Sequence, residues 1–340
     1  TISKIALYNG TTSPPSLDEK TSISNVPNDT RYEETNTGKI FRKHKYGWKE
    51  RDGGTQQDIA TADPFRGVFM GGQNANIDYI TINTEGDASD FNADLSASNG
   101  SGAGCDNNTR GVTGFGGSPS NIEYITIGTT GTATDSTQDR SNTSDEIAAC
   151  SDQTTRGIFA GGSSSQAEID YITIASISSA SDYGDLSAGR SALAGCGDAT
   201  RGLFGGGSTG SIVNTIDYIT IAIPQATATD FGDLSQARRH LAATASETRG
   251  VFAGGHATYD NIDYVTIATT GTAADFGNLV NGRYGVTGVS NYIRAVFGSS
   301  NYSGANRTEM DYITIQTLGN ASPFGDLTYA RSNSSGVSGN

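Results

Sequence analysis

Lysine is the clearest absence from this sequence, because none occurs after Lys49. Of the 22 basic residues, nine lie in residues 1–52 beside seven acidic ones, so the 13 that follow are all arginines and accompany 29 acidic residues. A nucleic-acid partner needs cations to neutralise its phosphates, so we expect none for this acidic region. The break in composition also predicts two modules, residues 1–52 and residues 53–340.

Long apolar runs are missing as well. No run approaches the roughly 20 residues that span a membrane, so we expect no membrane insertion. The first residues, TISKIALYNG, lack the basic start and apolar core of a secretory signal. Only 34% of the residues are hydrophobic, but they are clustered and periodic, which argues against disorder. Many short strands joined by turns rich in glycine, serine and threonine fit this pattern better.

Cysteine is scarce. Cys105, Cys150 and Cys196 lie 45 and 46 residues apart, which is neither a CxxC pair nor a zinc-ligand spacing. The even spacing places them at one equivalent position of a repeated unit. We therefore expect small buried residues there, with neither a disulfide framework nor a metal site.

The sequence repeats one phrase six times. In the fourth copy it consists of RGLFGGG, then IDYITI, then DFGDL. The copies follow one another at steps of 44, 46, 45, 48 and 45 residues. A period of this length with short β signals predicts an all-β fold, a six-bladed β-propeller of four-stranded blades, preceded by a small β-rich module. The copies begin at Arg66, Arg110, Arg156, Arg201, Arg249 and Arg294.

Strand composition predicts how each blade is arranged. The first strand signal holds only small residues, as in ALAGCG at 192–197, and suits the crowded axis of a ring. The third alternates strictly, so Ile216 and Tyr218 should face one neighbouring blade and Ile219 the other.

The sequence contains seven first-strand signals but only six units, so one signal must complete a blade whose other strands lie elsewhere in the chain. Because Arg331 precedes the last signal, we expect residues 335–339 to complete the blade that begins at Arg66; residues 55–63 are the alternative.

These units resemble the kelch family. An arginine precedes strand one, Gly-Gly ends strand two and a tyrosine lies in strand three, as in a kelch unit. Phenylalanine or tyrosine replaces the kelch tryptophan in strand four, unit two has Ser136 there, and unit six has Ser299–Ser300 in place of Gly-Gly. The resemblance covers about residues 55–340. It implies a kelch-like propeller and says little about activity.

Acidic residues recur at two positions of the unit. A residue present in every blade serves every blade, so we expect pairing with arginine or hydrogen bonds to strand-end amides. No calcium loop or phosphate loop occurs, and the three histidines lie in different contexts. We expect no enzymatic activity, no metal and no cofactor. The two sets are Asp78, Glu123, Asp170, Asp217, Asp263 and Asp311, and Asp90, Asp135, Asp182, Asp230 and Asp275.

The loop between strands two and three is the least regular part of the unit. It grows from four residues in units one and two to nine in unit six. Uneven loops that carry aromatic and polar residues predict a recognition surface, with simple tolerance of insertions as the alternative. Tyrosine can stack on a sugar ring while asparagine, aspartate and arginine bond its hydroxyls. The candidate ligand-binding residues are His256, Tyr259, Asp260, Asn301, Tyr302, Asn306 and Arg307.

Residues 1–52 do not share the repeat. KIFRKHK at 39–45 and WKER at 48–51 predict a β-hairpin. DTRYEETNTGKIF at 29–41, with GWKE at 47–50, resembles a segment that recurs in tailed-phage virion proteins, often ahead of a repeat region. The resemblance implies a tail fibre or related virion appendage, made in the host cytoplasm and located in the virion.

The same resemblance implies partners for both modules. Residues 1–52 would dock to other tail or baseplate proteins, a homo-oligomer would form, and the propeller would face a host-surface glycan or receptor. Phe41 and Trp48 are the candidate docking residues, because aromatic side chains dominate interface energetics; a small local core is the alternative role. Two other functions stay open, a purely structural virion subunit and a kelch-like enzyme that acts on carbohydrate through two carboxylates.

Overall fold

The computed structural model describes residues 31–33, 40–44, 47–50, 65–98, 100–114, 121–139 and 144–339. The regular elements among these residues are all β-strands, and none of the described residues belongs to a helix with the length and apolarity to cross a membrane. The chain divides into two compact units, Thr1–Pro64 and Phe65–Asn340. The predicted boundary between residues 52 and 53 falls outside the described residues.

The first unit contains one small antiparallel sheet. Its strands are β1 (Arg31–Glu33), β2 (Ile40–His44) and β3 (Gly47–Glu50), in the order β1-β2-β3. Lys43 pairs with Trp48 and His44 with Gly47, so β2 and β3 form the predicted hairpin.

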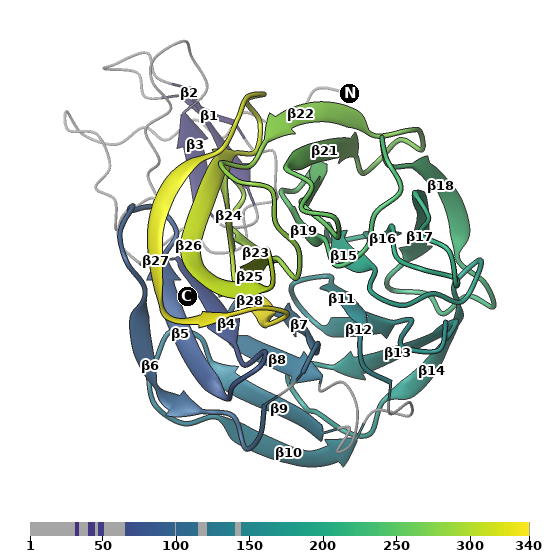
Figure 1. The fold of residues 1–340 in the computed structure, drawn as a ribbon, viewed down its shortest axis with the longest axis horizontal. Coiled ribbons are helices and arrows are strands. Elements are labelled where there is room, and N and C mark those ends of the chain that lie inside the picture. The colour runs from purple at the N-terminus through teal and green to yellow at the C-terminus, as the bar shows by residue number, and fades with distance from the viewer. Residues whose placement is uncertain are drawn as a thin grey trace. The chain divides into compact units, whose positions relative to one another are not determined.

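The second unit is a six-bladed β-propeller (Figure 1). Each blade is an antiparallel sheet whose strands follow one another from the axis outwards, so the predicted fold class is confirmed. Blade 1 contains β28 (Ser335–Gly339), β4 (Arg66–Met70), β5 (Asn76–Thr81) and β6 (Ser89–Asp94); blade 2 contains β7 (Ala103–Asp106), β8 (Arg110–Gly114), β9 (Asn121–Thr126) and β10 (Thr134–Asp139); blade 3 contains β11 (Ala148–Ser151), β12 (Arg156–Ala160), β13 (Glu168–Thr173) and β14 (Ser181–Asp185). Blade 4 contains β15 (Ala194–Gly197), β16 (Arg201–Gly205), β17 (Thr215–Thr220) and β18 (Thr229–Asp233); blade 5 contains β19 (Ala242–Ala245), β20 (Arg249–Ala253), β21 (Asn261–Thr266) and β22 (Ala274–Asn278); blade 6 contains β23 (Thr287–Ser290), β24 (Arg294–Gly298), β25 (Ser300–Tyr302), β26 (Ala305–Thr314) and β27 (Ser322–Arg331).

The last strand closes the ring. β28 pairs with β4, with Val337 opposite Val68, so the predicted C-terminal closure is confirmed. The inner strands contact one another in an unbroken circle, β28 to β7, β11, β15, β19, β23 and back to β28. Figure 1 shows these strands around the axis and the fourth strands on the circumference.

The third strand of each blade packs against both neighbours. In β17, Ile216 and the half-buried Tyr218 join a cluster with residues of blade 5, whereas Ile219 joins a cluster with residues of blade 3. This is the alternation that the sequence predicts. Each blade is therefore apolar on both sides, and the cores of the propeller lie between blades.

Glycine at the start of strand two lets neighbouring blades approach closely. A Cβ on Gly202 would lie 2.5 Å from Sγ of Cys150 in the preceding blade. Cys150, Cys105 and Cys196 are all buried free thiols on inner strands, as predicted. Burial is the main cause that raises the pKa of each thiol, to about 12 for Cys196.

Buried ion pairs tie the connection that enters a blade to its third strand. Arg238 Nη2 lies 2.8 Å from Asp263 Oδ2, and the two side chains are 0% and 1% exposed. The Ser235 hydroxyl donates to the same carboxylate at 2.7 Å. The predicted pairing of the recurrent acids with arginine is thus confirmed in four blades, as Arg190–Asp217, Arg238–Asp263, Arg283–Asp311 and Arg331–Asp78. In blade 2, Glu123 accepts a hydrogen bond from the Ser96 amide.

A second arginine, the first residue of each repeat, links successive blades. Its guanidinium stacks 4.2 to 4.8 Å from the ring centroid of the tyrosine in its own blade. In blade 3, Nη1 of Arg156 also donates to the Ile221 carbonyl of blade 4 at 2.8 Å. Equivalent bonds join every blade to the next, and the last runs from Arg294 to Ile82 of blade 1.

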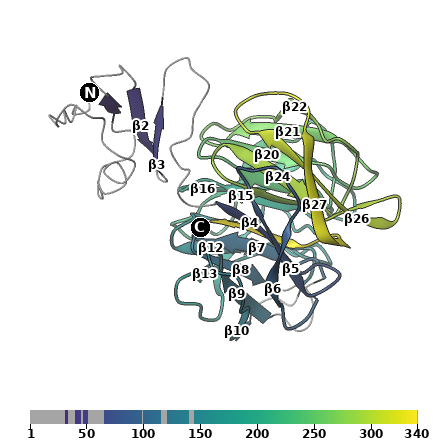
Figure 2. The same ribbon diagram turned by 90° about the vertical axis from the view of Figure 1, so that its left-hand side faces the viewer.

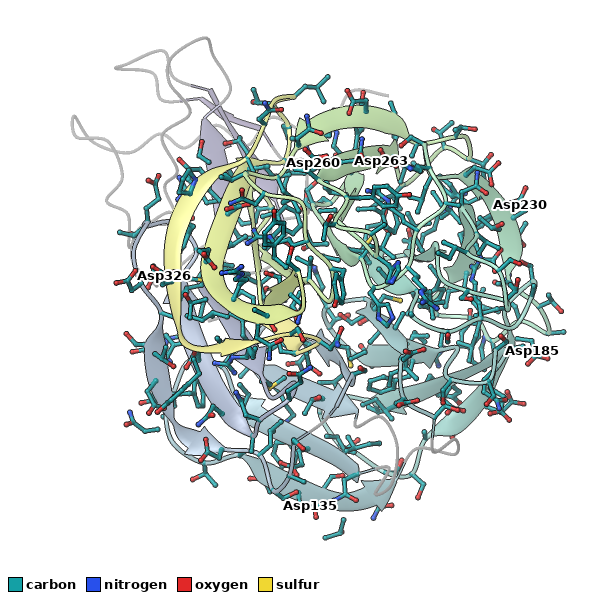
Figure 3. All side chains as sticks on the ribbon, viewed as in Figure 1. Asp135, Asp185, Asp230, Asp260, Asp263 and Asp326 are labelled. Carbon is teal, nitrogen blue, oxygen red and sulfur yellow. The ribbon has the colours of Figure 1, made fainter. Side chains whose placement is uncertain are left out.

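Acidic side chains of the fourth strands line the circumference. Figure 3 shows Asp135, Asp185, Asp230 and Asp326 at the rim of the ring, and all four are exposed. Asp135 accepts a hydrogen bond from the Thr137 amide at 2.8 Å. Charge on an outer strand opposes edge-to-edge pairing with another chain, which gives these acids a structural role.

Candidate functional site

The propeller has two different faces. The antiparallel order of a blade places its first and third turns on one face and its second loop and exit connection on the other. We call the first the turn face, represented in blade 4 by residues 198–200 and 221–228. We call the second the loop face, represented there by residues 206–214 and 234–241. All the predicted ligand-binding residues belong to loop-face segments.

The inner strands begin at the loop face with an unusual backbone conformation. The residue two positions before each inner strand has φ between +53° and +115°. Left-handed backbone is unfavourable for residues other than glycine and persists only where the surrounding structure enforces it. The six residues, which we call the axial ring, are Ser101, Glu146, Ala192, His240, Gly285 and Asn333.

Main-chain hydrogen bonds hold the axial ring. The amide of Ala192 donates to the carbonyl of Glu146, and that of His240 to the carbonyl of Ala192, both at 2.8 Å. The same bond recurs from Gly285 to His240 and from Asn333 to Gly285. The backbone therefore repeats from Glu146 to Asn333, while the side chains differ in charge, size and chemistry from blade to blade.

The axial ring surrounds the mouth of a cavity of about 130 Å³. The walls below it are small residues of the inner strands, such as Ala148, Ala194 and Gly288. Glu146 and His240 also line the cavity, and they are its ionisable side chains among the described residues. Small walls with polar groups at one end are typical of a compact ligand site.

An aromatic cluster adjoins this mouth. The Tyr284 ring lies 6.4 Å from the ring of His240 and 5.8 Å from that of His256, centroid to centroid. Nε2 of His240 lies 3.6 Å from Oε1 of Glu146. Burial lowers the pKa of His240, the Glu146 carboxylate opposes this effect, and Arg239 and His256 add to it. The imidazole is therefore neutral at neutral pH and can both donate and accept a hydrogen bond.

Tyr284 also joins the two groups of predicted residues. Its carbonyl accepts from the Asn301 amide at 2.8 Å, and its amide donates to the Asn301 carbonyl at 3.1 Å. His256 of blade 5 thus contacts the ring of Tyr284, and Asn301 of blade 6 contacts its main chain, so both meet one residue of the connection between those blades. Asn301 itself is buried, and its side-chain amide donates to Asn306 Oδ1 at 3.0 Å.

Blade 6 departs from the predicted loop. The nine residues NYSGANRTE form a hairpin, in which β25 pairs with the first part of a lengthened β26. β27 is equally long, and the two strands stand out as yellow arms in Figures 1 and 2. Arg307 lies 5.4 Å from the centroid of the exposed Tyr302 ring. Asn306 donates to Gln73 of blade 1 at 2.5 Å, which anchors the hairpin to the neighbouring blade.

Tyr259 and Asp260 contribute mainly through their main chain. The Tyr259 carbonyl accepts from the Arg283 amide at 3.2 Å, and that of Asp260 from the Leu279 amide at 2.7 Å. Among the described residues, neither side chain has a hydrogen-bond, ion-pair or ring partner, so both are available to a ligand. Phe41 and Trp48 lie in β2 and β3, and their side chains fall outside the described structure.

The sequence did not predict Glu146, His240 or Tyr284 as residues of the site. His240 and His256 lie in unlike stretches of sequence, yet both contact Tyr284. One signal points to the axial ring. When the six units are aligned, the position two residues before strand one holds six different residue types, whereas the position that follows it is small or aliphatic in every unit.

The remaining chemistry of the site is limited. No group of three or more potential ligands suited to a metal ion occurs among the described residues. No protein-family model matches the chain, and no curated protein shows a significant match to it. Function must therefore be argued from the propeller fold and the geometry of its loop face.

Proposed function

We propose that the propeller is a carbohydrate-binding module and that its loop face carries the binding surface. The observation that carries this proposal is the contrast within the repeat. The turn-face bonds and the buried ion pairs recur in several blades, whereas the loop face holds His240, His256, Tyr284 and Tyr302, residue types that no other blade has at the equivalent position. A scaffold that varies on one face alone is typical of recognition.

Side-chain chemistry on this face suits a sugar. The exposed Tyr302 ring and the half-buried Tyr259 offer aromatic faces, and Asp260 offers a carboxylate without a partner among the described residues. Aromatic rings pack on the apolar face of a pyranose, and carboxylates accept bonds from its hydroxyls. Binding energy here would come from few groups, as in most interfaces.

The biological setting we propose is a tailed-phage virion. The segment at 29–41 supports a tail fibre or related appendage in which residues 1–52 dock to tail or baseplate proteins and the propeller recognises a host-surface glycan. Homo-oligomerisation and a role without catalysis belong to the same proposal. Phe41 and Trp48 would be the docking residues.

Binding of the full chain to host cells and to purified envelope polysaccharides tests this function. We expect the double variant Tyr259→Ala/Tyr302→Ala to bind at least tenfold more weakly. A matched turn-face variant, Ile223→Ala/Leu318→Ala, removes two exposed apolar side chains and should bind normally. Absence of binding to every envelope fraction, together with binding to isolated virion subunits, would instead establish the purely structural role. Release of reducing ends from a polysaccharide would establish an enzyme.

A further inference from the structure

The two ends of the propeller axis differ in how their polar groups are satisfied. At the turn-face end, the Ser338 amide donates to Asp106 Oδ2 at 2.9 Å, and the Ser290 amide donates to the Ser338 hydroxyl at 3.0 Å. The Thr244 hydroxyl continues this chain to the Ser290 hydroxyl at 2.6 Å. Polar side chains at this end are thus engaged with one another.

At the loop-face end, the side chains of Thr287 and Ser334 bond to one another at 3.0 Å, but those of the axial ring make no such bond within the described structure. Glu146 Oε1 approaches His240 Nε2 no closer than 3.6 Å, which exceeds a hydrogen bond. Within the described structure, the side chains of Ser101 and Asn333 have no hydrogen-bond partner. Four polar groups of different kinds therefore converge on one cavity mouth without satisfying one another.

The size of the cavity fits one small molecule. A volume of about 130 Å³ holds roughly four waters at about 30 Å³ each, and it is close to the roughly 150 Å³ of a cavity that admits one six-membered ring. The walls are alanine, glycine, serine and threonine, together with Ile147, Leu193, Leu241 and Val286, each next in sequence to a residue of the axial ring. Polar selection among ligands must come from the side chains at the mouth.

Charge at the mouth disfavours anions. Among the described residues, no lysine or arginine lines the cavity, and Glu146 brings a carboxylate to its edge. Arg239, which acts on the pKa of His240, lies outside the lining. The chain carries a net charge of −14, which adds long-range repulsion of anionic molecules. An uncharged ligand rich in hydroxyl groups can donate to the carboxylate and exchange hydrogen bonds with a neutral imidazole.

The aromatic cluster supplies the remaining surface. The Tyr284 and His256 rings are tilted by 49° to one another beside the mouth, and the His240 ring is tilted by 56° to Tyr284. Such a wall packs against the C–H face of a sugar while its hydroxyl edge meets the polar groups. The mouth therefore offers an aromatic surface to the apolar face of a sugar ring and polar groups to its hydroxyls.

We propose, building on the carbohydrate recognition argued above, that the axial mouth binds one uncharged pyranose residue. Glu146 and His240 bond its neighbouring hydroxyl groups, Asn333 and Ser101 bond hydroxyls further round the ring, and Tyr284 with His256 covers its apolar face. The loop-face hairpin then contacts the rest of a longer glycan. Acidic sugars are excluded by Glu146.

Titration of the full chain with methyl pyranosides of glucose, galactose and mannose, and with glucuronic acid, tests this site. Calorimetry or ligand-observed magnetic resonance should detect at least one neutral pyranoside and no glucuronic acid. Glu146→Gln keeps the shape of the side chain, and we expect it to weaken pyranoside binding at least tenfold. The matched control Asp230→Asn removes an exposed carboxylate from the circumference and should leave binding unchanged. Thermal unfolding of both variants excludes loss of folding as the cause.

Failure of this site can be told apart from failure of carbohydrate recognition. Envelope polysaccharide that binds normally to Glu146→Gln but poorly to Tyr259→Ala/Tyr302→Ala would overturn the axial site and leave the loop-face function intact. Preference for glucuronic acid, or no binding of any pyranoside, would also overturn it. Pyranoside binding that depends on Glu146, without any polysaccharide binding, would support the site and overturn glycan recognition on a host surface.

Discussion

The turn face and the loop face are built from the same six units but use their side chains differently. On the turn face, Asp198 Oδ1 accepts from the amides of Thr200 and Arg201, both at 2.7 Å, and Asn291 makes the equivalent bonds in blade 6. On the loop face, six different side chains stand on one repeated backbone. The turn-face side chains therefore support the fold, whereas the axial ring of the loop face leaves polar side chains for a ligand.

The two faces share a buried foundation, and breaking it should have the largest effect. Asp263→Ala leaves Arg238 buried without its partner, and breaking such a pair typically lowers the free energy of unfolding by about 3–5 kcal/mol. Burial already lowers the pKa of Arg238, and the Asp263 carboxylate opposes that effect. Urea unfolding measures the loss. A loss of unfolding free energy as small as that of the circumference variant Asp230→Asn would contradict this role.

Close packing between blades should give the next largest effect. Gly202→Ala places a methyl group against Cys150 Sγ, and overpacking of this kind costs about 1–3 kcal/mol. Cys150→Ala in the same chain removes the clashing sulfur and should restore most of the stability. A double-mutant cycle in thermal unfolding checks this coupling. Purely additive effects would show that the two residues do not meet.

The contrast between the faces can be tested directly with two aspartates. Asp198→Ala removes the acceptor for the turn amides and should lower stability by about 1 kcal/mol. Asp260→Ala on the loop face should change stability by less than about 0.5 kcal/mol, because its side chain has no partner among the described residues. Urea unfolding of both variants measures their losses of stability, and polysaccharide binding is the second measurement. Equal losses of stability would contradict the difference between the two faces.

The smallest expected effect concerns pH. Because burial lowers the pKa of His240 in the folded state, the unfolded chain binds a proton at higher pH than the folded chain. Stability should therefore be fully present above the ordinary histidine value and fall as the pH drops below about 6.5. His240→Gln should flatten this part of the profile. Unfolding of both chains is measured between pH 8 and pH 5. If the unfolding free energy depends on pH in the same way in both, a group other than His240 causes the dependence.

The sequence predicted the parts of the fold that repetition specifies. Six copies of one phrase indicate the blades, and an arginine before a first-strand signal correctly places the closing strand at Val337 beside Val68. Recurrence also identified Asp217 and Asp263 as structural, because a catalytic pair would not appear in every blade. These predictions succeed since each depends on residues within one unit or its neighbour.

The site was harder to predict because it depends on departures from the repeat. NYSGANRTE contains no clear alternation, so the blade 6 hairpin could not be recognised from pattern alone. The left-handed φ of Glu146 and His240 has no sequence signature, unlike that of a glycine. The meeting of His240 with Tyr284 requires the ring geometry that brings adjacent blades to one axis.

Closure by β28 has a consequence for synthesis. Of the described strands, β28 is translated last, yet it is the inner strand of the first blade. Until it emerges from the ribosome, β4 presents an open edge with Val68 exposed beside it, and such an edge can pair with another chain. The circle cannot be sealed before β28 has left the ribosome, so this last step of assembly waits for it and is open to assistance from chaperones.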